Sequence, residues 1–271
     1  MTRIEELVLQ RQAIDAEIAA EYKKEGEAAA RGEAVAQFNL GLIYYKGQGV
    51  EQNYVQAFNA FKLASEQGKT EAHVYLGLMY ERGQGTSKDY AKAAYWLELA
   101  AKEGNPEALN RLGEMLENGL GVKQDFQAAM RCYKLSAEKQ HPAAEFNIGL
   151  MYELHRGVEQ DDMEAISWYK LASKHRSAEA QSKLGFMYGN AHGVPLNFPE
   201  SLRWYLLAAE QEHPAALSNL GFMYDHGQGV PMDSQKALSY YHKAARKGDE
   251  NAKKNRDIIE ARLAKQQSKI Q

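Results

Sequence analysis

The apolar residues of this chain recur at the spacing of amphipathic α-helices, and the whole pattern returns every 36 residues. In residues 71–83 the apolar positions stand at i, i+4, i+7 and i+8, which places them on one face of a helix. They are Ala72, Leu76, Met79 and Tyr80. Residues 89–104 show a similar helical spacing, with Ala93, Trp96, Leu97 and Ala100. Each period therefore predicts two helices.

Small residues mark the repeat most clearly. A glycine follows Leu or Ile in every period, at Gly41, Gly77, Gly113, Gly149, Gly185 and Gly221. Alanine forms a second column with the same spacing, at Ala36, Ala72, Ala108, Ala144, Ala180, Ala216 and Ala252. Six gapless repeats span positions 33–248, with shorter segments before and after them. This regularity predicts one continuous repeat array, because a single repeat of this size cannot bury its apolar face alone.

Glycine pairs predict where the first helix of each repeat ends, because glycine adopts the left-handed C-cap conformation without steric cost. The Gly-x-Gly pairs are Gly47/Gly49, Gly83/Gly85, Gly119/Gly121 and Gly227/Gly229. Two repeats keep only the second glycine and have His155 and Ala191 at the first position, and whether these departures serve a function is left open. Asp89 and Asp125 stand where they can cap the second helices that follow.

The glycines after Leu or Ile predict close helix crossings, since two helices approach closely only where side chains are small. Aromatic residues in neighbouring columns are expected to fill the volume on either side. We expect Gly113→Leu to overpack such a crossing and to cost about 1–3 kcal/mol or more.

These residues carry a family resemblance. The segments AHVYLGLMYERGQG with AAYWLELAAKEG, and ALSNLGFMYDHGQGV with ALSYYHKAARKG, resemble the Sel1-like repeat, a relative of the tetratricopeptide repeat. The resemblance covers about four-fifths of the chain. It implies an all-α fold, a right-handed α/α superhelical solenoid of six 36-residue helix-turn-helix repeats with helical caps. It also implies a protein-interaction scaffold, often bacterial, whose first helices line a concave face.

The segments on either side of the repeats are predicted to cap the array. Residues 1–32 are expected to form an N-terminal amphipathic helix and half-repeat cap, 33–248 the repeats, and 249–271 a C-terminal capping helix. An alternative for the N-terminal segment is a short coiled-coil surface, because four apolar residues approximate a heptad seam. They are Ile4, Leu7, Ile14 and Ile18. At the other end, we expect three apolar residues to cover the last repeat, namely Ile258, Ile259 and Leu263.

Composition narrows the function classes. The 33 Lys and Arg nearly balance the 36 Asp and Glu, which argues against a general nucleic-acid or polybasic membrane binder. The sequence has no apolar run long enough to span a membrane and no secretory signal. We therefore expect a cytoplasmic protein with no membrane insertion, although export without a signal is an alternative. Cys132 is the one cysteine, and it fits a buried, inert thiol better than a reactive one.

No catalytic, metal or cofactor site is predicted. The Gly-rich turns lack the strand and the Gly-Lys-Ser/Thr sequence of a phosphate loop. His155, His192 and His226 recur near one loop edge, but a metal site there would need further ligands, and Asp225 is one candidate. We therefore expect a protein that is not an enzyme and needs no cofactor.

A polar column in the first helices is the predicted partner-binding site. It lies two residues before the glycine that follows Leu or Ile in each repeat, at Asn39, Tyr75, Arg111, Asn147, Lys183 and Asn219. Asparagine can donate to and accept from an extended peptide backbone, and Arg111 and Lys183 could hold carboxylates. A solvated helix face explains the column equally well. Phe38 and Phe146 are the expected exposed apolar contacts. The next column, which includes Phe186 and Phe222, lines the groove floor or packs between adjacent first helices, and packing is favoured for most of it.

The leading hypothesis is an adaptor that binds another protein or a peptide in its concave groove and is itself a monomer. Three alternatives are kept. They are a regulatory oligomer assembled through the N-terminal helix, an exported bacterial effector built on the same scaffold, and an enzyme with an unrecognised site.

Overall fold

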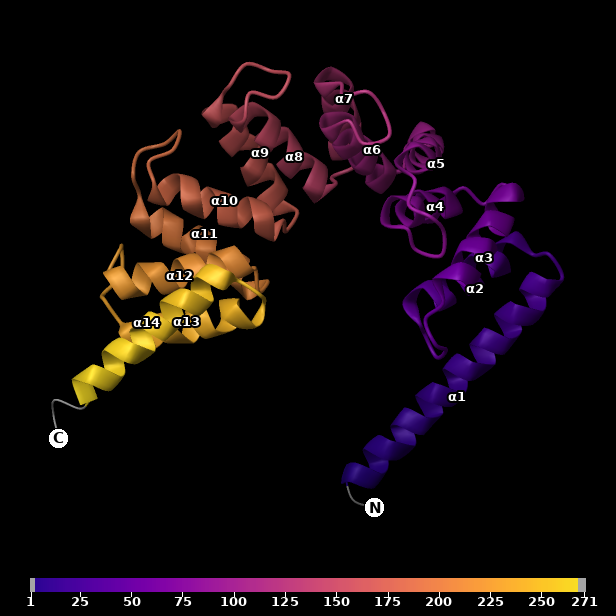
Figure 1. Ribbon diagram of the computed structural model, residues 1–271, viewed down its shortest axis with the longest axis horizontal. Coiled ribbons are helices and arrows are strands. Elements are labelled where there is room, and N and C mark those ends of the chain that lie inside the picture. Colours follow the sequence, from indigo (N-terminus) through magenta and orange to yellow (C-terminus); the bar gives the residue numbers. More distant parts are fainter. Residues whose placement is uncertain (1–2, 268–271) are drawn as a thin grey trace. The chain divides into compact units, whose positions relative to one another are not determined.

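The computed structural model describes residues 3–267, with the side chains of positions 4–5, 8–9, 11–16, 18–19 and 266–267 left aside. These residues form fourteen α-helices and no strand (Figure 1). The all-α fold predicted from the repeat is therefore confirmed, and each repeat contains the two expected helices. Among the described residues, no helix is both long and apolar enough to cross a membrane.

The chain divides into two compact units between Ser136 and Ala137, at the end of the seventh helix. The helices up to this division are α1 (Arg3–Ala30), α2 (Ala34–Lys46), α3 (Tyr54–Glu66), α4 (Glu71–Arg82), α5 (Tyr90–Lys102), α6 (Pro106–Asn118) and α7 (Phe126–Ala137). Those that follow are α8 (Pro142–Glu153), α9 (Asp162–Lys174), α10 (Ala178–Gly189), α11 (Phe198–Glu210), α12 (Pro214–His226), α13 (Ser234–Arg246) and α14 (Glu250–Gln267). The division into caps and repeats at positions 32 and 248 stays a prediction.

The helix ends follow the predicted signals. The Asp89 and Asp125 carboxylates accept the backbone N–H of Lys92 and Ala128, as N-caps do. Glycines such as Gly47, with φ 68°, close the first helices in the left-handed conformation. His155 and Ala191 adopt the same conformation, with φ 54° and 55°, although they carry a Cβ. The turn geometry is therefore set by the repeat, not by the glycine alone.

Each repeat is held together where its first helix crosses its second. At the fourth repeat, a Cβ added to Gly149 would lie 2.4 Å from the Tyr169 ring. At the fifth, a Cβ on Gly185 would lie 2.6 Å from the Tyr205 ring. The corresponding distance from Gly113 to the Tyr133 ring is 2.6 Å. No side chain fits at these glycines without displacing a ring, which confirms the predicted close crossings.

The terminal helices pack on the repeats next to them. In the first unit, the Tyr22 and Tyr44 hydroxyls of α1 and α2 are 2.9 Å apart. Leu7 is exposed, and the other three residues of the proposed heptad seam lie outside the described side chains. In the second unit, Ile259 of α14 is fully buried against the last repeat with Leu263 beside it, whereas Ile258 is 58% exposed. The expectation that Ile258 covers the last repeat is therefore wrong.

Candidate partner-binding face

The polar column that the sequence predicts as the partner-binding site, here named the contact column, lies on successive first helices of each unit. In the first unit it comprises Asn39 of α2, Tyr75 of α4 and Arg111 of α6. In the second it comprises Asn147 of α8, Lys183 of α10 and Asn219 of α12. All six residues are half-buried. Each therefore keeps part of its surface accessible while it also packs against the fold.

In the first unit the column begins in a cluster of aromatic rings. The Tyr75 ring stacks on Phe61 with centroids 4.8 Å apart, and it meets Phe38 and Tyr45 of α2 edge-on, at 5.7 Å each. Burial raises the pKa of the Tyr75 hydroxyl, so this group stays a hydrogen-bond donor at neutral pH. Phe38 is half-buried rather than exposed, because it packs on Phe61 as well as on Tyr75.

Arg111 is already paired within its own helix. Its Nε lies 2.9 Å from a Glu107 oxygen, and its Nη1 lies 3.0 Å from a Glu114 oxygen. The same Glu114 side chain accepts a hydrogen bond from the buried Asn110 amide at 2.9 Å. Because two carboxylates compensate this guanidinium, Arg111 offers a partner less positive charge than its sequence suggests.

Lys183 is also paired, but across two helices. Its Nζ lies 2.9 Å from Glu153 Oε1, and Glu153 is 8% exposed. The other Glu153 oxygen accepts a hydrogen bond of 2.6 Å from the Tyr169 hydroxyl. Burial, followed by this hydrogen bond, raises the pKa of Tyr169 and keeps its proton in place. Phe146 is half-buried rather than exposed, since its ring packs on Tyr169 with centroids 5.4 Å apart.

A buried glutamate that accepts a hydrogen bond from a tyrosine occurs in both the third and the fourth repeat. Tyr133 donates to the buried Glu117 at 2.6 Å in the same way that Tyr169 donates to Glu153. The equivalent position holds Tyr45, Glu81, Glu117, Glu153, Gly189 and Asp225. In the last repeat this acid, Asp225, pairs instead with Arg262 of α14 at 2.7 Å. The fifth repeat lacks the acid altogether, because Gly189 stands there.

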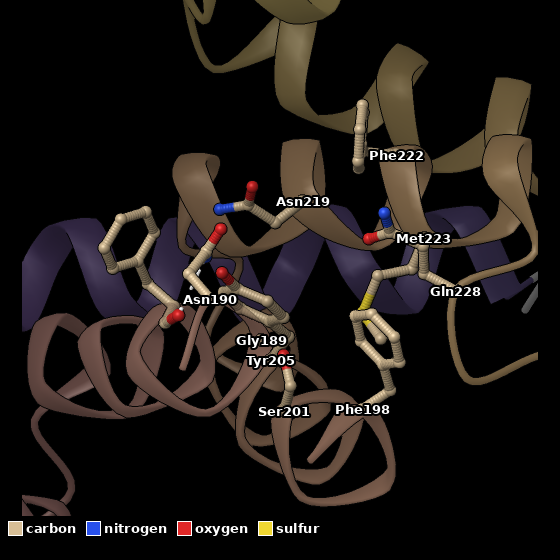
Figure 2. A pocket seen from close by; sticks show the side chains of 10 residues that line it. Gly189, Asn190, Phe198, Ser201, Tyr205, Asn219, Phe222, Met223 and Gln228 are labelled. Atoms are coloured by element: carbon tan, nitrogen blue, oxygen red, sulfur yellow. Dashed lines mark hydrogen bonds between the residues drawn. The ribbon is translucent and has the colours of Figure 1, made fainter. Parts of the chain in front are cut away.

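A pocket of about 130 Å³ opens beside Gly189 in the second unit (Figure 2). Its lining comes from α10, α11, α12 and the turns after α10 and α12: Phe186, Gly189, Asn190, Phe198, Ser201, Tyr205, Asn219, Phe222, Met223 and Gln228. Figure 2 shows the polar ends of Tyr205, Asn190 and Asn219 gathered at one side of it. Two lining rings are exposed, Phe186 by 42% and Phe222 by 40%. These two rings are thus the members of their column that stay exposed, whereas its other four residues are half-buried.

Sequence reasoning placed Asn219 in the column and offered Phe186 and Phe222 as groove-floor residues, but it missed the rest of this pocket. The signal was present, because Gly189 interrupts a column that is otherwise acidic or aromatic. A second signal is Ser201, which replaces the alanine found at the same position in the other five repeats, as in Ala165. The two changes are complementary, since a Cβ at Gly189 would lie 2.8 Å from the Ser201 hydroxyl.

The histidines and the cysteine singled out by the sequence lie among the described residues. No group of three or more His, Cys, Asp or Glu side chains could hold a metal ion there. His192 and His226 each approach a single carboxylate, Asp162 at 3.4 Å and Asp225 at 3.9 Å. Cys132 is half-buried, and burial raises the pKa of its thiol, so the reactive thiolate form is disfavoured.

Comparison with known proteins agrees with the repeat. The family model for the Sel1 repeat matches six consecutive segments, residues 34–69, 70–105, 106–141, 142–177, 178–213 and 214–249. No match was found among the curated proteins. The matched segments keep the 36-residue period, offset by one residue from the boundaries read from the sequence.

Solved structures with the same fold include two with substantial sequence identity. A Sel1 repeat protein from Oxalobacter formigenes is 30% identical over 83% of this chain and 99% of its own, with a TM-score of 0.75. The protein c5321, a protective antigen present in uropathogenic Escherichia coli strains, is 31% identical over 89% of this chain, with a TM-score of 0.68. This chain spans about half, 52%, of the c5321 chain.

A more distant likeness in fold is to yeast Tom70. Yeast Tom70 is 13% identical over 92% of this chain and 52% of its own, with a TM-score of 0.57, which shows a shared fold alone. The Sel1 repeats of this chain therefore form a helical repeat scaffold.

Proposed function

Because this chain belongs to the Sel1 repeat family, we propose that it is a non-enzymatic scaffold that binds a protein or peptide segment along the face of its first helices. The observation that carries the proposal is the contact column itself. Side chains in one register of successive first helices are half-buried, and their amides and rings remain accessible. A segment lying across the first helices of one unit would meet one such side chain in each of that unit's repeats.

The charges of the column suggest how recognition works. Arg111 and Lys183 each have a carboxylate partner within 3.0 Å, so an acidic segment would have to compete with these ion pairs. Two of the neutral side chains, Asn39 and Asn219, make no hydrogen bond with any residue that the structure describes. Recognition through amides and aromatic rings is therefore favoured over recognition through the two cations.

Substitutions that block the column can be chosen from side chains that other repeats already carry at the same position. Tyr75 occupies the column in the second repeat, so the helix tolerates a tyrosine there, and Asn39→Tyr with Asn219→Tyr should fill the face without unfolding it. The matched control places the same side chain on second helices, as Asn59→Tyr with Ser239→Tyr. Both control positions are exposed, and Tyr95 already occupies the equivalent position.

The experiment is affinity purification with mass spectrometry, using the full chain in wild-type and both double variants. We expect the column variant to lose its specific partner by about tenfold or more, and the control to keep it, which corresponds to about 1.4 kcal/mol or more of binding free energy. Equal partner recovery with both variants, at equal helicity by circular dichroism, would place binding elsewhere.

A further inference from the structure

The fifth repeat differs from the fourth at one buried position with a clear chemical consequence. In the fourth repeat, the Glu153 carboxylate occupies the space beside the Tyr169 hydroxyl. In the fifth, Gly189 leaves the equivalent space beside Tyr205 as the pocket of about 130 Å³. A single water needs roughly 10–15 Å³ by this measure, so the pocket can hold a group much larger than one water.

Tyr205 lines this space, and its hydroxyl has no partner within the described part of the chain. The residue as a whole is only 4% exposed, and its hydroxyl makes no hydrogen bond with any described residue. Because the hydroxyl opens onto the pocket, it is free to donate to a group that enters there. Burial also raises the pKa of this hydroxyl, so it remains a donor. The pocket therefore lacks a hydrogen-bond acceptor at the place where the fourth repeat supplies a carboxylate.

A second donor position is shared by the two repeats. Lys183, in the first helix of the repeat that follows Glu153, donates to the Glu153 carboxylate. Asn219 holds the same position in the repeat that follows Gly189, and it lines the pocket. Its amide lies on the same side of the pocket as the Tyr205 hydroxyl (Figure 2). Both donors of the fourth repeat thus have counterparts around the pocket, and only the acid is missing.

We propose that this pocket binds the carboxylate of an Asp or Glu side chain from the bound protein segment, in the place that Glu153 occupies in the fourth repeat. The inference rests on the proposed function for the origin of the carboxylate. The Tyr205 hydroxyl and the Asn219 amide donate to its oxygens, and the exposed Phe186 and Phe222 rings contact the segment beside it. Hydrogen bonds to an ionised acceptor are the stronger kind, so neutral donors suffice to select an acid over an amide.

The test uses the full chain and a peptide-like probe, the α-amide of N-acetylglutamate, with the α-amide of N-acetylglutamine as the neutral match. Binding is followed by the side-chain amide signals of Asn219 and Asn190 in ¹H–¹⁵N NMR spectra. We expect saturable shifts with the glutamate probe and about tenfold weaker binding of the glutamine probe. Tyr205→Phe should weaken the glutamate probe by about tenfold while the melting midpoint stays unchanged, because its hydroxyl has no internal partner.

A second variant fills the pocket from within. Gly189→Glu with Ser201→Ala recreates the acid and alanine of the fourth repeat, and it should abolish the shifts. Equal binding of the two probes, or binding that Tyr205→Phe and the filled pocket leave intact, would overturn the carboxylate site. If the probe binds as expected but Asn39→Tyr with Asn219→Tyr retains the partner, the pocket stands and the proposed function fails.

Discussion

The fourth and fifth repeats have the same two-helix arrangement and differ in the group next to the hydroxyl of their buried tyrosine. Tyr169 donates to Glu153 at 2.6 Å, and Lys183 completes the ion pair at 2.9 Å. Tyr205 occupies the same position in the fifth repeat but faces a pocket. Three substitutions separate the two arrangements: Glu153 to Gly189, Ala165 to Ser201 and Lys183 to Asn219.

The comparison teaches that one helical crossing can be either closed or open to a ligand. The Ser201 hydroxyl donates to the Gly185 carbonyl at 2.6 Å and occupies the space beside Gly189, so the helices keep their spacing without the acid. The tyrosine is retained although its internal acceptor is gone. A repeat protein can therefore open a pocket in one unit while the neighbouring units keep the fold.

The largest expected effect tests whether the two crossings are equally tight. Gly149→Leu and Gly185→Leu should each reduce the free energy of unfolding by about 3 kcal/mol, because either side chain would collide with a buried tyrosine ring. Gly26→Leu is the matched control, since a Cβ there meets nothing within 4 Å. Urea unfolding followed by circular dichroism measures the change. A loss at Gly149 alone would mean that the fifth crossing is looser than its geometry indicates.

The next largest effect is a difference in stability between removing the Tyr169 hydroxyl and removing the Tyr205 hydroxyl. Tyr169→Phe should cost about 1–3 kcal/mol, because it removes a donor from the buried Glu153 carboxylate. Tyr205→Phe should change the free energy of unfolding by less than about 0.5 kcal/mol. The same unfolding measurement applies to both. Similar losses would show that the Tyr205 hydroxyl has an internal partner after all.

A smaller change, a gain in the free energy of unfolding, is expected when a glutamate fills the pocket of the fifth repeat. Gly189→Glu with Ser201→Ala should be more stable than Gly189→Ala with Ser201→Ala by about 1 kcal/mol, because only the glutamate can accept from Tyr205. Comparing two double variants removes the general benefit of replacing a helical glycine. A glutamate variant less stable than the alanine variant would indicate that burying the charge without a lysine outweighs its hydrogen bonds.

The smallest effect concerns the helix caps that follow the two repeats. Ser177 caps α10, whereas His213 caps α12 by accepting the Ala216 N–H at 3.4 Å. Burial lowers the pKa of His213, and Glu179 opposes this only in part. The neutral form of His213 is therefore favoured in the folded protein. Its contribution to stability is complete above pH about 6.5 and is lost as the pH falls through the lowered pKa.

Asparagine serves as the pH-insensitive replacement at this cap. Asn105 caps α6 at the equivalent position, so His213→Asn should preserve the cap. We expect melting midpoints measured from about pH 8 to about pH 5 to decline less steeply in this variant than in the wild-type protein, since fewer protons bind on unfolding. Identical slopes for the two proteins would exclude His213 as a source of the acid sensitivity.

The fold was predictable from the sequence because its determinants are local and repeated. Helical periodicity fixes the buried faces, and glycines such as Gly149 and Gly185 reveal the crossings without knowledge of the partner ring. Non-glycine residues at a left-handed turn, such as Ala191, could not be foreseen to keep the same geometry, since the constraint comes from packing of the whole repeat.

The candidate site was less predictable because its determinants join different helices. The column register identified Lys183, but its partner Glu153 lies in the preceding repeat, and only the structure shows their contact. Phe186 and Phe222 line the space left open at Gly189, and only the structure shows that they are exposed there. That gap was visible as an interruption of the acid column, yet its meaning required the unpaired Tyr205 hydroxyl beside it.

The central claim is that the open fifth repeat receives an acid from a partner where the fourth repeat uses its own. The most direct measurement is the dissociation constant of the purified partner for the filled pocket, Gly189→Glu with Ser201→Ala, against the empty pocket, Gly189→Ala with Ser201→Ala. We predict that the filled pocket weakens binding by about tenfold or more relative to the empty one, or about 1.4 kcal/mol. Equal dissociation constants for the two variants would contradict the claim.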